Sequence, residues 1–221
     1  MEILAKPNTN LSEDWMILVF LVMLAIVALI RTRYPLHFRQ LINSFLSDRL
    51  MRQLMREETS TKRESLLFFL NFFLSIGMML YLTHRVYSWF EFSFPGFVLF
   101  LVYVLAVLAF YALKSLVIHT VRFLSDGNYG LDEYHYILFF MNRISGLFLF
   151  PLTVLAAYLD RGIAPWVLLA GWVVFGFFVV FGLLRGILGA LKMGVEVFYI
   201  FFYICTLEFL PLLLLFKLLT R

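Results

Sequence analysis

The amino-acid sequence predicts an all-α, polytopic membrane helical bundle with six transmembrane helices. Of its 221 residues, 63% are apolar and only 14% are charged. A soluble domain needs roughly a quarter of its residues charged to cover its surface. The apolar residues also come in long continuous blocks, which is typical of membrane spans. We therefore expect residues 1–221 to form a single integral-membrane domain, with the lipid bilayer as its first partner.

The limits of the six spans follow from the polar residues that interrupt the apolar blocks. The first block ends at Arg31 and Arg33 and lacks the basic start and cleavage site of a signal peptide, so we interpret it as a retained anchor. The second block follows a capping box, Thr61-Lys-Arg-Glu64. The predicted spans are about 15–30, 65–82, 96–113, 136–159, 163–184 and 195–216.

Residues 35–58, between the first two spans, are predicted to form an amphipathic segment at the cytoplasmic face. Apolar residues recur at helical spacing on both sides of Ser47, which predicts two short helices joined there. A basic amphipathic helix beside a span lies by default on an anionic leaflet, and docking onto a partner protein is the alternative. The residues expected to contact the membrane surface or a partner are Arg39, Arg49, Arg52 and Arg56.

The distribution of basic residues predicts the topology. With the 31–64, 114–135 and 185–194 loops inside, the inner side holds twelve Lys or Arg and the outer side five. Because basic residues concentrate in cytoplasmic loops, this split places both termini on the outer side.

Two spans combine a polar or charged residue with a proline. In the sixth, Glu208 stands three residues before Pro211. In the fourth, Asn142 and Arg143 precede Pro151. An unpaired charge at mid-bilayer costs at least ~3 kcal/mol. We therefore expect Arg143 to pair with Glu208, across a difference in height of roughly 9 Å.

This pairing has two interpretations. A structural ion pair that sets helix register is favoured, because only one such pair is present. A proton or ion relay is the alternative, since charges inside membranes are functional by default. The predicted intramembrane polar seam comprises Arg143, Glu208, Asn142, Pro151, Pro211 and Glu196.

Small residues recur every fourth position across the end of the fifth span. This spacing lets two helices approach closely. We expect packing between the fifth and sixth helices, with homodimerisation as the alternative. The helix-packing residues are Gly182, Gly186, Ala190 and Gly194.

Other classes of site find no support in the sequence. The four histidines are scattered and the single cysteine lies in the sixth span, so we expect no metal ion and no cofactor. The net charge of +4 is too small and too local to predict nucleic acid as a partner. No hydrolase, P-loop or dinucleotide motif is present, so a non-catalytic role is favoured over an enzyme.

Two stretches resemble the recurring blocks of a known family. They are Asn142-Arg143-Ile-Ser-Gly-Leu-Phe-Leu-Phe-Pro151 and Tyr203-Ile-Cys-Thr-Leu-Glu208-Phe-Leu-Pro211, the second followed by Lys217. The family is a domain-of-unknown-function family of polytopic inner-membrane proteins from Bacteroidota. The resemblance covers most of the chain from the first span onward. It implies a bacterial inner membrane facing a periplasm, and it brings no known activity.

Two functions follow as expectations. The first is a non-catalytic subunit or scaffold that docks onto other membrane proteins of a larger cell-envelope assembly, with secretion or gliding machinery as candidates. The second is a small transporter or proton-coupled channel that uses Glu208 and Arg143. The two halves of the chain show no internal repeat, and many secondary transporters are built from such repeats, which favours the first.

Overall fold

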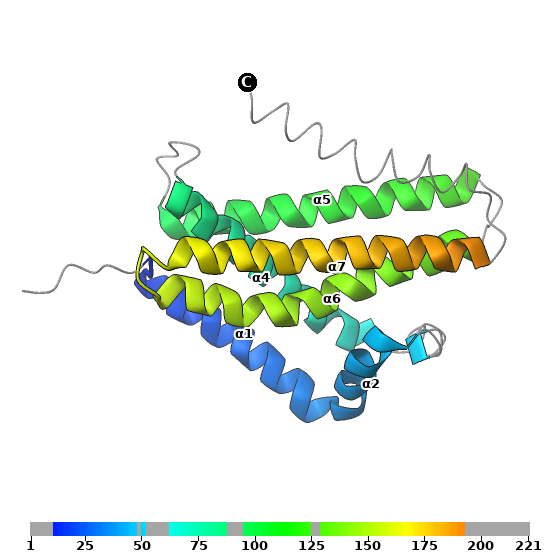
Figure 1. Ribbon diagram of the computed structural model, residues 1–221, viewed down its shortest axis with the longest axis horizontal. Helices are drawn as coiled ribbons and strands as arrows, with labels where there is room; N and C mark the ends of the chain where they lie inside the picture. Colours follow the sequence, from blue (N-terminus) through cyan, green and yellow to red (C-terminus); the bar gives the residue numbers. More distant parts are fainter. Residues whose placement is uncertain (1–10, 48–49, 52–61, 88–94, 125–128, 193–221) are drawn as a thin grey trace, which may run out of the picture. The chain divides into compact units, whose positions relative to one another are not determined.

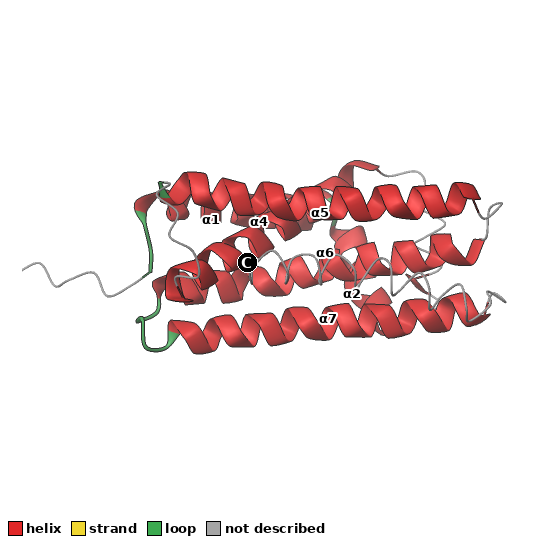
Figure 2. Ribbon diagram, turned by 90° about the horizontal axis from the view of Figure 1, so that it is seen from above, coloured by secondary structure: helices red, strands yellow, loops and turns green. Residues whose placement is uncertain are grey.

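The computed structural model describes residues 11–47, 50–51, 62–87, 95–124 and 129–192. Within these ranges the chain is helical, with short loops between helices (Figure 2). The all-α class is therefore confirmed for the part of the chain that is described. The helices are α1 (Asp14–Arg33), α2 (Pro35–Leu46), α4 (Lys62–Tyr87), α5 (Gly96–Leu124), α6 (Tyr129–Tyr158) and α7 (Ala164–Lys192) (Figure 1).

Five helices in the described ranges are long and apolar enough to cross a membrane. They coincide with the first five predicted spans, so the protein is a multi-pass helical membrane protein. The sixth predicted span, 195–216, lies outside the described residues. The membrane-length segments are Asp14–Arg33, Ser65–Tyr87, Gly96–Leu116, Tyr136–Tyr158 and Ala164–Gly189.

The turn from α1 into α2 is set by a proline. Pro35 occupies the first turn of α2, where its missing N–H costs no helical hydrogen bond. A residue before proline is disfavoured in the helical conformation, and Tyr34 accordingly leaves it, with φ −132° and ψ 53°. Its N–H still donates to the Ile30 carbonyl at 3.0 Å, which closes the end of α1.

Helix α2 ends at Leu46, and Ser47 has extended backbone, at the position where the sequence predicts a joint. Two apolar side chains of α2 contact other parts of unit 1. Leu41 is buried, and the Phe45 ring lies 5.5 Å from that of Phe178 in α7. Arg39 is exposed. Leu41 and Phe45 of the amphipathic segment thus pack against protein, and Arg39 points outward.

The chain divides into two compact units, with the boundaries inside α5, α6 and α7. Unit 1 comprises Met1–Val107 and Asn142–Phe178. Unit 2 comprises Leu108–Met141 and Val179–Arg221.

Helix α4 forms the centre of unit 1, and two of its glycine contacts show how closely its neighbours approach. A Cβ at Gly77 would lie 2.5 Å from a methyl group of Val104 in α5. A Cβ at Gly171 of α7 would lie 2.8 Å from the terminal methyl of Met79. Small residues at such crossings let membrane helices gain van der Waals contact. Side chains on every side of α4 are consequently buried.

Unit 2 shows the same kind of contact between α6 and α7. A Cβ at Gly182 would lie 3.1 Å from the Met141 side chain and 3.7 Å from that of Leu138. The ring of Tyr111 in α5 meets that of Phe139 edge to face, with centroids 6.2 Å apart. The described part of unit 2 is therefore held by close helix contacts and aromatic packing.

Candidate functional site

Arg143 lies in α6, four residues before the middle of the membrane-length segment Tyr136–Tyr158, or about 6 Å from it. Only 7% of its surface is exposed. Its guanidinium carbon lies 4.6 Å from the centroid of the Phe69 ring in α4. A cation over an aromatic face is attracted by the ring quadrupole, and the attraction grows when water is excluded. The structure thus places the predicted intramembrane charge in the protein interior, against an aromatic ring.

One turn further along, α4 and α6 meet at backbone distance. A Cβ at Gly146 would lie only 2.7 Å from the Phe72 Cα, so a larger residue does not fit there. The Ser75 hydroxyl donates to the Gly146 carbonyl at 3.1 Å. A small residue and a hydroxyl are a common combination where membrane helices associate. This crossing fixes the register that brings Phe69 under Arg143.

The other polar side chains of this region bond mainly to backbone. Ser145 donates to the Asn142 carbonyl at 2.8 Å, and Thr153 donates to that of Phe150 at 2.7 Å. Such bonds to the preceding turn satisfy a hydroxyl without water. Asn142 itself is buried, with 8% of its surface exposed.

Asn71 is a buried polar group that sequence reasoning did not include in the polar seam. The parallel register of α4 and α6, which pairs Phe69 with Arg143, places it level with Ser145. It is fully buried, and among the described residues neither polar atom of its side chain has a hydrogen-bond partner. A buried amide without such bonds costs free energy, so Asn71 marks a position where a water or a further side chain would bind.

The remaining members of the predicted seam have different outcomes. Pro151 lies inside α6, which continues through it, and its ring frees the carbonyl of Leu147 from the helix ladder. Glu208, Pro211 and Glu196 lie outside the described residues. The pairing of Arg143 with Glu208 therefore stays a prediction.

The predicted packing stripe is described only in part. Gly182 packs on α6, the helix of the fourth predicted span, and Gly186 is buried. The predicted partner, residues 195–216, lies outside the described ranges, and so does Gly194. The side chain of Ala190 is likewise not described.

The predicted surface-contact residues are also described in part. Arg39 is exposed on α2, as a membrane or partner contact requires. The other three, Arg49, Arg52 and Arg56, lie outside the described residues. Because Leu41 of α2 is buried against the protein, the described contact surface of this helix is polar and basic.

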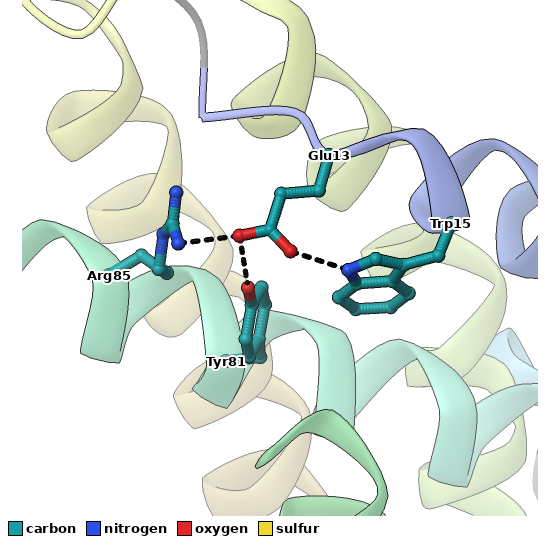
Figure 3. Close-up of polar contacts among 4 residues, drawn as sticks. All are labelled: Glu13, Trp15, Tyr81 and Arg85. Carbon is teal, nitrogen blue, oxygen red and sulfur yellow. Dashed lines mark hydrogen bonds and ion pairs between the residues drawn. The ribbon is translucent and has the colours of Figure 1, made fainter. Parts of the chain in front are cut away.

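A second polar site lies at the end of unit 1 where α1 begins, and sequence reasoning missed it. The Glu13 carboxylate accepts hydrogen bonds from three described side chains (Figure 3). The Arg85 guanidinium donates at 2.5 Å and forms an ion pair, and the Tyr81 hydroxyl donates at 3.1 Å. The indole N–H of Trp15 donates at 2.5 Å. We call Glu13, Trp15, Tyr81 and Arg85 the carboxylate cluster.

Sequence analysis could have found a signal for this cluster. The predicted topology places Glu13, before the first span, and Arg85, after the second, on the same side of the membrane. An acid and a base at neighbouring span ends suggest a pair. In the structure Glu13 occupies the N-cap position of α1 but makes no capping hydrogen bond, because its carboxylate is committed to the cluster.

Among the described residues, no three His, Cys, Asp or Glu side chains come together in an arrangement that could hold a metal ion. The polar interior and the carboxylate cluster are thus the two candidate sites. The first is buried at membrane depth and the second lies at the ends of the helices.

Comparison with known proteins places the chain in a family. No curated protein and no solved structure matches it. One family model does match, and it covers residues 16–219, which include both Arg143 and Glu208. With nearly the whole chain inside this match, the protein belongs to the family described as domain of unknown function DUF4271.

Proposed function

We propose that the protein is a non-catalytic membrane subunit, or scaffold, that docks onto a larger assembly of the cell envelope. The observation that carries the proposal is the close packing of α4 and α6 beside Arg143. The guanidinium lies on the Phe69 ring, and the helices carrying these residues meet at Gly146 with no room for a side chain. Two helices packed this closely support a rigid scaffold, because the contact holds them in register.

Hydrogen bonding in unit 1 supports the same proposal. The hydroxyls of Ser75, Ser145 and Thr153 all donate to main-chain carbonyls. A transport path needs polar groups that face water or a solute. Hydroxyls already bonded to backbone contribute to packing instead.

The proposed location is the inner membrane of a two-membrane bacterial envelope. Six spans and both termini in the periplasm are part of the proposal, supported by the uneven distribution of basic residues. Cysteine labelling from the outer face, in a Cys205→Ser background, tests the topology. We expect labelling at residue 5 and none at residue 58, and the reverse pattern would contradict the orientation.

The function is tested by isolating the protein in mild detergent and determining what remains bound. We expect a second membrane protein at a fixed molar ratio that survives gel filtration, identified by mass spectrometry. Native mass spectrometry then measures the stoichiometry. A chain that remains alone in lipid nanodiscs as well as in detergent would contradict a docking subunit.

A small transporter or proton-coupled channel is the second candidate, and one observation favours it. Arg143 is a cation inside an apolar span, and such charges mark ion pathways by default. Under this proposal Arg143 and Glu208 carry the path. Flux of protons into proteoliposomes, measured with an enclosed pH-sensitive dye, tests it. If the Arg143→Gln variant kept native stability but lost a measured proton flux, the result would support the transporter and contradict the scaffold.

A further inference from the structure

The carboxylate cluster has the chemistry of a binding site. We propose that Trp15, Tyr81 and Arg85 form a carboxylate-binding site whose resident ligand is Glu13, so that the start of α1 is held by an exchangeable latch. This inference does not depend on the proposed function.

The donors match the acceptors of a carboxylate. An ionised carboxylate has two oxygens that only accept hydrogen bonds, and here both are used. One oxygen accepts from Arg85 and Tyr81, and the other from the Trp15 indole. A guanidinium, a phenol and an indole are all donors toward this position, and the guanidinium supplies the compensating charge.

Two of the three donors are held in place by contacts that do not involve the Glu13 carboxylate. Tyr81 is fully buried in α4. The Trp15 indole is packed among three rings, with centroids 5.3 Å away at Tyr81, 5.4 Å at Phe100 and 5.5 Å at Phe97. Aromatic packing of this kind holds the two donors in place independently of Glu13. Removing Glu13 should therefore leave an open site.

A glycine completes the site. Gly96 is the first residue of α5, and a Cβ there would collide with the Glu13 carboxylate and lie 2.7 Å from the Tyr81 hydroxyl. The start of α5 thus lies so close to the carboxylate that the carboxylate would have to move if residue 96 had a side chain. Because this approach depends on glycine, substitution at Gly96 should expel the carboxylate.

Solvent reaches the cluster. The side chains of Glu13 and Arg85 are 28% and 37% exposed. An ion pair at a partly exposed position contributes little stability, so a carboxylate from solution can compete with Glu13 for these donors. The ligand class is therefore a small or side-chain carboxylate.

Chemical rescue tests the site. Glu13→Gly removes the resident carboxylate and leaves the N-cap position of α1 with a residue that caps acceptably. We expect a fall in Tm of about 2–4 °C. Sodium acetate should restore most of it in a saturable way, while sodium chloride at the same pH and concentration should not. Equal effects of the two salts would overturn the proposal.

Two comparisons isolate the site from general effects. In Glu13→Gly with Arg85→Gln, acetate should restore nothing, because the cationic donor is gone. Asp14→Asn is the matched control for Glu13→Gln, since it removes the same charge one residue away, at an exposed position. We expect the Glu13 variant to lose clearly more Tm than the Asp14 variant. Equal losses would mean that only net charge matters.

If the Glu13→Gly variant does not fold, Gly96→Ala provides a second test of the same site. The added methyl should displace the carboxylate, so Gly96→Ala and Glu13→Gln should each lower Tm and their combination should lower it no further. Non-additivity of this kind shows that both changes act on one interaction. Fully additive losses would show that the glycine and the carboxylate do not share a site, and would overturn the proposal.

Discussion

Arg85 and Arg143 belong to the same unit, but their positive charges are stabilised by contacts of different kinds. Arg85 stands in the last turn of α4, is 37% exposed on its side chain and meets the Glu13 carboxylate at 2.5 Å. Arg143 lies inside α6, is 7% exposed and has the Phe69 ring 4.6 Å from its guanidinium carbon. The first contact joins opposite charges near water, and the second joins a charge to a neutral ring away from water.

The difference follows from the cost of desolvation. A second charge brought into the interior must itself lose its hydration, so an ion pair there gains less than its Coulomb energy suggests. An aromatic ring has little hydration to lose and still offers a negative face. At the helix ends both ions keep part of their hydration, and a direct pair forms at low cost. Desolvation therefore accounts for the direct ion pair at Arg85 and for the benefit of an aromatic ring beside the buried Arg143.

The largest expected effect concerns whether Arg143 also meets a carboxylate, that of Glu208. If the two pair, Glu208→Gln or Arg143→Gln alone leaves one charge stranded, at a cost of about 3–5 kcal/mol in soluble proteins and less in a membrane. The double variant should recover part of the lost thermal stability, measured in detergent as Tm. Strictly additive losses would mean that the two groups do not pair, and Arg143 would then differ from Arg85 in kind.

The next largest effect should come from the helix crossing beside Arg143. Gly146→Ala places a methyl 2.7 Å from the Phe72 Cα, and backbone cannot move aside as a side chain can. Overpacking of this type costs about 1–3 kcal/mol. Thermal unfolding in detergent measures it.

A glycine in an open position provides the control. No described atom lies within 4 Å of a Cβ built on Gly176 in α7. Alanine has the better helix propensity, so Gly176→Ala should leave Tm unchanged or raise it. A loss at Gly176 as large as that at Gly146 would mean that the loss at Gly146 does not come from the close contact with Phe72.

Replacing the Phe69 ring beside Arg143 should cause a smaller loss of stability that depends on the presence of the arginine. Phe69→Leu keeps most of the apolar volume and removes the quadrupole, which costs about 0.5–2 kcal/mol where a cation is desolvated. The same substitution in an Arg143→Met background should cost less, since no cation remains. If the cost were equal in both backgrounds, the ring would only be filling space.

The smallest effect is expected at Arg85. Its side chain is partly exposed, and ion pairs of this kind contribute about 0.2–1 kcal/mol. The loss caused by Arg85→Gln should also shrink as salt is added, because salt screens exposed charges. The loss caused by Arg143→Gln should be insensitive to salt. Parallel salt dependence of the two would remove the distinction between the two arginines.

Part of the candidate site could be predicted from the sequence. Arg143 stood out because a charge in an apolar block is costly wherever its neighbours lie. Phe69 did not stand out, because it is one of 27 phenylalanines and nothing local distinguishes it. Only the crossing of α4 and α6 at Gly146 selects this ring. The carboxylate cluster was missed for the same reason, since Glu13 and Arg85 are 72 positions apart.

The sequence by itself determined the helical class, the first five spans and the position of Arg143 inside the fourth, because the hydropathy of a block depends only on the residues within it. The tertiary structure decided which side chains meet. Helix contacts depend on register and on a few ångströms of backbone approach, and these arise from packing between segments distant in the chain. Three contacts are of this second kind: the Phe69 ring beside Arg143, the packing of Phe45 in α2 against Phe178, and the three donors around Glu13.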